Sequence, residues 1–170
     1  MKRRARTNLI LIVVVALLGT AIYAELRREQ TIAEPLTPLD TDAVHTLVVT
    51  CNACKPRRFE KDGVHWRMLE PYAQAADDRA IARLLAIARA PVRLRHAAGE
   101  LDAKKIGLDP PLATLQLDGT LLKFGMTDAI DGDRYADVGG VIALVPDRFS
   151  VLLFAAPENE LAKPPPVAKD

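Results

Sequence analysis

The chain begins with an apolar stretch that stands apart from the mixed pattern after it. No charged residue lies between Leu9 and Ala24, in the sequence "LILIVVVALLGTAIYA". Sixteen apolar or small residues, together with their flanks, lie at the lower edge of the roughly 17–25 that cross a bilayer as a helix. The pattern therefore predicts a transmembrane anchor over residues 8–24, after a basic start at residues 1–7.

Four cations, Lys2, Arg3, Arg4 and Arg6, precede the apolar stretch. The positive-inside rule places this end in the cytoplasm. A cleaved signal peptide is the alternative, with "GTA" at residues 19–21 as a cleavage site. Both interpretations send the rest of the chain out of the cytoplasm. We expect a single-pass inner-membrane protein with a periplasmic C-terminal domain.

Polar segments with prolines flank the predicted domain. Residues 25–42 contain two prolines and many charges, which is typical of a juxtamembrane stalk. Residues 161–170 contain three consecutive prolines, which fit neither a helix interior nor a central strand. We expect a disordered tail there. Residues 43–160 are then the globular domain.

The first half of this domain alternates in the manner of strands. Residues 44–50 form a β-branched run, and residues 57–61 and 64–69 alternate on either side of the Asp62–Gly63 turn. The alternation predicts one shared face for Val64, Trp66 and Met68.

A helical pattern follows these strands in the sequence "DDRAIARLLAIARA". Its apolar stripe has helical spacing and comprises Ile81, Leu84, Leu85 and Ala88. Asp77 or Asp78 can cap its start, and Pro91 ends it.

The second half repeats this order. Strands are expected at residues 113–118, 120–124, 133–138 and 141–145, and a helix opened by Pro146 follows them. The expected apolar stripe of that helix is Phe149, Leu152, Leu153 and Ala156. Between the halves, we expect one short helix that ends at Gly107.

These elements predict an α+β fold. Its antiparallel β-hairpins have helices packed on one face, strand–strand–strand–helix order occurs twice, and one transmembrane helix precedes the domain.

The net charge of +1 conceals an acidic body. Without the four N-terminal cations, 19 basic residues face 22 acidic ones, a charge of −3 for residues 8–170. Nucleic-acid binding needs a basic face for phosphate contacts. We therefore expect no nucleic-acid partner.

Cys51 and Cys54 form the sequence "TCNACK", which has three interpretations. A redox pair needs a helix after the motif, but an alternating strand follows. A structural zinc site needs four ligands, and His45, His65 and His96 show no paired-ligand spacing. A local disulfide suits an oxidising compartment and is our hypothesis.

Other chemical motifs are weak. The aspartates of residues 128–133 lack the order of a calcium loop, so a solvated hairpin loop is favoured. The basic segment "PRRFEK" at residues 56–61 is interpreted as a solvated hairpin face, with a contact patch for anionic lipid or an acidic partner as the alternative. No catalytic triad or nucleotide fingerprint is visible. We assign no catalytic, cofactor-binding or metal-binding residue.

Four short segments occur along the domain in the order "DGVHWRMLEP", "KKIGLDPP", "LLKFG" and "DRYADV". This order resembles that of the bacterial domain-of-unknown-function 4340 family. The resemblance covers about residues 44–155, with Ile106 at a position where the family has an aromatic residue. The matched positions are Trp66, Pro71, Gly107, Leu108, Pro111, Gly125, Arg134 and Tyr135.

This resemblance implies a membrane-anchored extracytoplasmic protein. Some members of the family accompany ABC-type transporters, including those linked to gliding motility, and the family offers no agreed catalytic residues. We therefore expect a non-catalytic accessory or scaffold with protein partners in an inner-membrane complex. The alternatives are a thiol–disulfide redox protein that uses Cys51 and Cys54, or a module that binds an envelope ligand.

Overall fold

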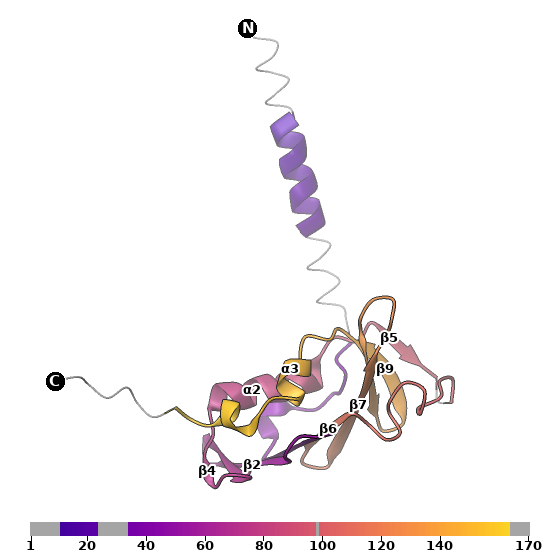
Figure 1. The fold of residues 1–170 in the computed structure, drawn as a ribbon. Coiled ribbons are helices and arrows are strands. Elements are labelled where there is room, and N and C mark those ends of the chain that lie inside the picture. The colour runs from indigo at the N-terminus through magenta and orange to yellow at the C-terminus, as the bar shows by residue number, and fades with distance from the viewer. Residues whose placement is uncertain (1–10, 24–33, 98, 164–170) are drawn as a thin grey trace, which may run out of the picture. The chain divides into compact units, whose positions relative to one another are not determined.

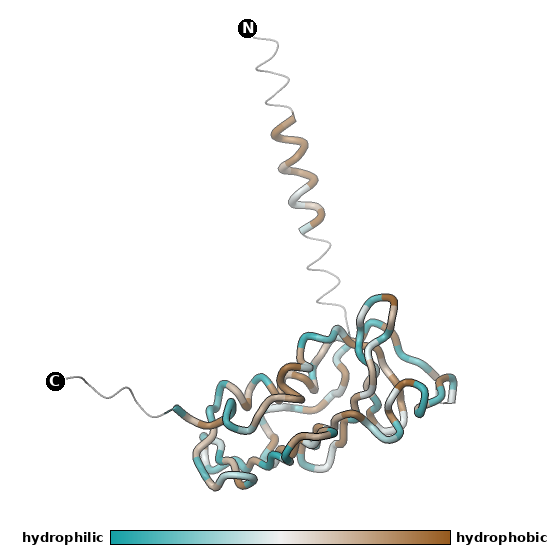
Figure 2. Tube along the Cα trace, viewed as in Figure 1, coloured by the Kyte–Doolittle hydropathy of each residue, from teal (hydrophilic) through white to brown (hydrophobic). Residues whose placement is uncertain are grey.

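The computed structural model describes residues 11–23, 34–97 and 99–163. The chain divides into two compact units, Met1–Glu34 and Pro35–Asp170. In the first unit, residues 11–23 form a helix, and all of them are exposed. Most of these residues are hydrophobic (Figure 2). Among the described residues, no helix is long and apolar enough to cross a membrane. Residues 1–10 and residue 24, which belong to the predicted start and anchor, lie outside the described residues.

The second unit is built on one antiparallel sheet of nine strands (Figure 1). Its spatial order is β4-β3-β2-β1-β6-β7-β8-β9-β5. The first group of strands comprises β1 (Thr46–Cys51), β2 (Arg57–Asp62), β3 (His65–Glu70) and β4 (Gln74–Ala75). The others are β5 (Leu94–His96), β6 (Ala113–Leu117), β7 (Thr120–Thr127), β8 (Arg134–Val138) and β9 (Val141–Val145).

Two meanders make up this sheet. Strands β1 to β4 follow one another outward in one direction, and β6 to β9 do so in the other. They join where β1 pairs with β6, from Leu47 opposite Leu117 to Cys51 opposite Ala113. The repeated order expected from the sequence therefore corresponds to two similar hairpin series that meet through their first strands.

Helices pack on one face of the sheet, as expected (Figure 1). The longest is α2 (Asp78–Ala86), whose start is capped by the Asp77 carboxylate and which continues as the 3-10 helix η2 (Ile87–Arg89). Near the C-terminus lie α3 (Ser150–Leu153) and η3 (Pro157–Glu160). A further 3-10 turn, η1 (Thr41–Ala43), precedes β1. The fold is thus α+β.

The core lies between these helices and the sheet. Alternate strand residues point into it, because successive side chains of a strand face opposite sides. Leu47 and Val49 of β1 are fully buried, and so are Leu115 and Leu117 of β6. The α2 stripe meets them with Ile81, Leu84 and Leu85, as the helical spacing predicts.

The connection between the halves differs from the sequence prediction. No helix forms in described residues 99–111, which fold as a series of turns instead of the expected helix ending at Gly107. The amide of Met126 in β7 donates to the Ile106 carbonyl at 2.8 Å, so the connection is tied to the sheet. Gly107 has a φ of +71°, which suits glycine. The hydrogen bond to β7 therefore determines the conformation of this segment.

Other elements also differ in their extent. Val64 lies in the β2–β3 turn and is 80% exposed, although the alternation predicts that it shares the buried face of Trp66 and Met68. The helix expected from Pro146 begins only at Ser150 and has four residues. Strands β4 and β5 were not predicted; both are short and occupy the two edges of the sheet.

Part of the predicted stalk and part of the predicted tail pack against the domain. Leu36 and Thr37 are buried, and their amides donate to the carbonyls of Ala90 and Ala88, each at 2.9 Å. At the other end, the amide of Ala162 donates to the carbonyl of Ala75 at 3.0 Å. The rest of the predicted stalk, residues 25–33, and of the tail, residues 164–170, lies outside the described residues.

The contact between the connection and β7 predicts a steric test. A Cβ atom added at Gly125 would meet the Ile106 carbonyl oxygen at 2.3 Å, whereas one added at Gly119 would meet nothing within 4 Å. We expect Gly125→Ala to lower the free energy of unfolding by about 1–3 kcal/mol, as overpacking does. We expect Gly119→Ala to change it by less than about 0.5 kcal/mol. Urea unfolding followed by circular dichroism measures both, and equal effects would contradict the close approach.

Candidate functional site

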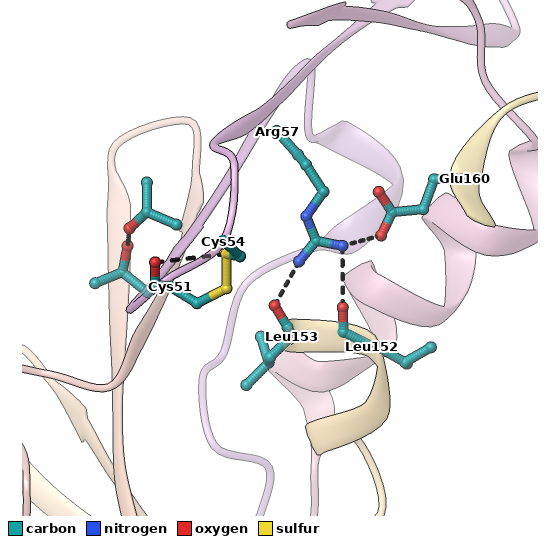
Figure 3. The surroundings of a disulfide bond; sticks show 8 residues. Cys51, Cys54, Arg57, Leu152, Leu153 and Glu160 are labelled. Carbon is teal, nitrogen blue, oxygen red and sulfur yellow. Dashed lines mark hydrogen bonds and ion pairs between the residues drawn. A yellow bond between two sulfur atoms is a disulfide. The ribbon is translucent and has the colours of Figure 1, made fainter. Parts of the chain in front are cut away.

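The two cysteines form a disulfide at the end of β1 (Figure 3). Their Cα atoms are 5.4 Å apart, a separation typical of disulfides. The turn between them is fixed by the Asn52 amide, which donates to the Leu112 carbonyl at 2.9 Å, and by Ala53, whose φ is +64°. Neither cysteine lies in a helix. The structure thus pairs the predicted cysteines and places them at the connection from β1 to β2.

The next inward-facing residue is Arg57, the first residue of β2, and it is fully buried. Its guanidinium crosses the core to the end of α3 (Figure 3). One nitrogen donates to the Leu152 carbonyl at 3.1 Å and to the Glu160 carboxylate, and the other donates to the Leu153 carbonyl. Carbonyl groups at a helix C-terminus carry partial negative charge, so a cation is favourable there.

Glu160 completes this buried pair and is only 4% exposed. Burial raises the pKa of its carboxyl to about 7, although the charge of Arg57 opposes that shift. Burial also lowers the pKa of the Arg57 guanidinium. Glu160 Oε2 and Arg57 Nε find no hydrogen-bond partner within the described part of the chain. Both charged groups are therefore removed from water, and the stability of the pair depends on the hydrogen bonds and the ion pair that remain.

The Arg57–Glu160 pair connects β2 to the last described residues of the chain. Besides its side-chain contact, Glu160 accepts a hydrogen bond on its backbone carbonyl from the Asp77 amide at 2.8 Å. Leu161 then forms a bridge with Ala76, beside the start of α2. Arg57 consequently links β2, α3, η3 and, through the Glu160 backbone, the N-terminus of α2.

A second buried arginine, Arg134 of β8, organises the other half of the domain. Its guanidinium donates to the Gly125 carbonyl and, at 2.9 Å, to the Asp147 carboxylate. Burial alone would raise the pKa of Asp147, but hydrogen bonds from Arg134 and Ser150 hold it below its ordinary value. Arg134 therefore connects β7, β8 and the start of α3.

Several positions matched in the family resemblance come together around this arginine. Gly107 and Leu108 pack directly over Gly125, whose carbonyl accepts from Arg134. Leu108 also forms a bridge with Pro111. The contacts of Gly107 and Leu108 with Gly125 hold the connection against the sheet, whereas the Leu108–Pro111 bridge closes a turn within the connection. The cluster is therefore structural in its geometry.

The other matched positions lie elsewhere. Trp66 is 6% exposed and belongs to the core. Pro71 follows β3 and is exposed, and Tyr135 of β8 is half-buried beside Leu144. The structure therefore does not gather all eight positions into one site.

The aspartate loop closes on itself. The Asp128 carboxylate accepts from the Ile130 and Asp131 amides, and these bonds lower its pKa. Burial raises the pKa of Asp133, which pairs with Arg93 at 3.1 Å. Among the described residues, no group of three or more His, Cys, Asp or Glu side chains is arranged to hold a metal ion.

The sheet face opposite the helices is called the open face here. Two rows of side chains cross it: Arg58, Val48, Gln116 and Leu121, and then Thr50, Thr114, Lys123 and Asp137. Thr50 and Thr114 share a hydroxyl hydrogen bond of 2.6 Å, and Lys123 pairs with Asp137 at 3.3 Å. A hollow of about 530 Å³ lies beside this pair, between the β6–β7 and β8–β9 turns.

The sequence interpretation missed the role of Arg57 and Glu160. The segment "PRRFEK" was interpreted as a solvated face, which is correct for Arg58 and wrong for Arg57. The spacing does contain a signal, because Arg57 lies two residues before the buried Phe59 on the same strand. Glu160 carries no comparable signal, since its partner is distant in sequence.

Comparisons with known proteins leave the family open. No protein-family model matches the chain, and neither a curated protein nor a solved structure matches it. The resemblance to the domain-of-unknown-function 4340 family therefore stays a prediction.

The buried pair predicts unequal effects for two adjacent arginines. Arg57→Met leaves the Glu160 carboxylate and two carbonyls without their cation, so we expect a loss of about 3–5 kcal/mol in the free energy of unfolding. Arg58→Met, on the open face, should cost less than about 0.5 kcal/mol. Urea unfolding measures both.

A double variant separates the pair from general packing. Removing both charges in Arg57→Met with Glu160→Met should cost less than the sum of the single variants, since neither charge is then left buried alone. Additive losses, or equal losses at Arg57 and Arg58, would show that the pair does not organise the core.

The disulfide predicts protected thiols. In full-length protein taken from cells without reductant, neither Cys51 nor Cys54 should react with an alkylating reagent, and both should react after reduction. The matched control is Cys51→Ser, which should leave Cys54 reactive. Because the closed loop is very short, the double serine variant should lose about 2 kcal/mol or less in stability. Alkylation of both cysteines before reduction would contradict the bond.

Proposed function

We propose that the chain is a membrane-anchored extracytoplasmic accessory protein that works through protein contacts. In this proposal, residues 8–24 anchor the chain in the inner membrane and the domain from Pro35 onward lies in the periplasm. The observation that carries it is the Cys51–Cys54 disulfide in a chain with a basic start and an uncharged apolar stretch. Disulfides persist in oxidising compartments, which an extracytoplasmic domain would occupy.

The uses of the ionisable residues support a scaffold role. Arg57 and Glu160 hold helices to the sheet, and Arg134 and Asp147 hold the second half together. Asp118 accepts from the backbone of His45 and from Thr46, and thus fixes the start of β1. The described clusters of charged groups therefore support the fold.

The open face is the surface that we assign to partner contacts. It combines exposed apolar groups, such as Leu121 at 42% exposure, with hydrogen-bonding and charged side chains and a shallow hollow. This mixture is typical of non-obligate protein interfaces. The resemblance implies partners that belong to an ABC-type transporter complex, which is the class that we expect here.

Crosslinking in cells tests this function. Full-length tagged protein, crosslinked and purified in mild detergent, should recover subunits of an inner-membrane complex, identified by mass spectrometry. Leu121→Asp should reduce that recovery, because it places a charge in the proposed interface. Val64→Asp is the matched control, since Val64 is exposed in the β2–β3 turn and off this face.

Two results would contradict the proposal. Release of the chain from membranes by an alkaline wash would contradict the anchor. Recovery of the protein alone, or only of mixed disulfides that vanish in Cys51→Ser, would instead favour an independent or redox role.

A further inference from the structure

The exposed side of α2 and η2 carries a row of arginines, called the arginine face here. Arg79, Arg83 and Arg89 are exposed, and Ala82 and Ala86 lie between them on the same side. Their spacing of three and four residues places all five on one helical face, opposite the buried stripe. Because the intervening residues are alanines, the guanidinium groups project from a flat surface.

The positive charges of the arginine face are not balanced by ion pairs among the described residues, because none of its three arginines forms one there. The two nearest acids in sequence are engaged: Asp77 caps the helix, and Asp78 accepts from His65 and from the Trp66 amide. The row therefore presents net positive charge on a body whose residues 8–170 sum to −3.

The chain enters the domain beside this row. Pro35 forms a bridge with Pro91, and the Leu36 amide donates to the carbonyl of Ala90, the neighbour of Arg89. The described part of the chain therefore places the entry point at the η2 end of the arginine face. Residues 24–34 are eleven residues, which can extend to at most about 40 Å.

We propose that the arginine face binds the anionic phospholipid surface of the membrane in which residues 8–24 are anchored. This inference rests on the anchor of the proposed function. Each arginine near an anionic leaflet is attracted to it and stabilises binding, and three arginines on one flat face act together. The anchor keeps the domain within reach of the surface, so that even weak contacts are populated.

The negative charge on the rest of the domain also favours one orientation of the domain on the membrane. An anionic surface repels the acidic remainder of the domain and attracts the arginine face, so one orientation is preferred. An acidic protein could also attract three arginines. Lipid is favoured because the chain enters the domain next to the arginine face, and the proposed anchor keeps the membrane close to that point.

Arginine modification in lipid nanodiscs tests the contact. The full-length protein is reconstituted in discs of phosphatidylcholine alone or mixed with phosphatidylglycerol, and reaction with phenylglyoxal is read by mass spectrometry. We expect Arg79, Arg83 and Arg89 to react about fivefold more slowly in the anionic discs. Arg58 lies on the open face, and Arg67 lies on the same side of the sheet, opposite Glu60 of β2. Both should react equally in the two kinds of disc. High salt should abolish the difference, because it screens surface charge.

Variants give a second measurement. A photo-crosslinking amino acid in place of Ala86 should capture lipid in the anionic discs. Capture should be lost with Arg79→Gln, Arg83→Gln and Arg89→Gln together, and kept with Arg58→Gln and Arg67→Gln together. All five positions are exposed, so the fold should persist in both variants.

The outcomes separate this inference from the proposed function. A chain that does not enter the discs contradicts the anchor and, with it, the lipid contact. A chain that enters, but whose three arginines react equally in both compositions, overturns the lipid contact alone. Protection in native membranes but not in anionic discs would assign the arginine face to an acidic protein and would also overturn it.

Discussion

The buried guanidinium of Arg57 is the constraint on which the rest of the domain depends. A fully buried cation is tolerated only where acceptors surround it, and here they come from the end of α3 and from Glu160. The helices therefore cannot slide along the sheet without breaking charged hydrogen bonds. The disulfide lies just before Arg57 in sequence and fixes the turn that starts β2. One short segment thus sets both the β1–β2 connection and the position of the helical layer.

The sheet is built outward from its two central strands, β1 and β6. Because β1 and β6 pair directly, each meander can add strands only at its far side, and the edges are closed by the short strands β4 and β5. Short edges limit pairing with other chains. The connection between the halves must then cross from the outer edge back to β6, and it does so by packing over Gly125. Because the connection passes so close to β7, a side chain at position 125 would clash with it, which explains the glycine there.

Local patterns predict the parts of the fold that local chemistry decides. Alternation places β1, β2 and β3, and the Asp77 cap and the stripe from Ile81 place α2, because each signal lies within one element. The connection over residues 99–111 was predicted wrongly, since a bond from Met126 in a distant strand determines it. Arg57 was missed for the same reason: its acceptors lie about a hundred residues away. The cysteine pair was predicted, because its three-residue separation makes the contact local.

The two proposals together assign opposite roles to the two sides of one layered domain. The arginine face belongs to the helical layer, and the open face is the other side of the sheet (Figure 1). If the helical layer lies on the lipid, the open face points away from the membrane and is accessible to a partner. This division requires that helices and sheet move as one body. The Arg57 contacts supply that rigidity, because they connect β2 to α3 and, through Glu160, to the start of α2.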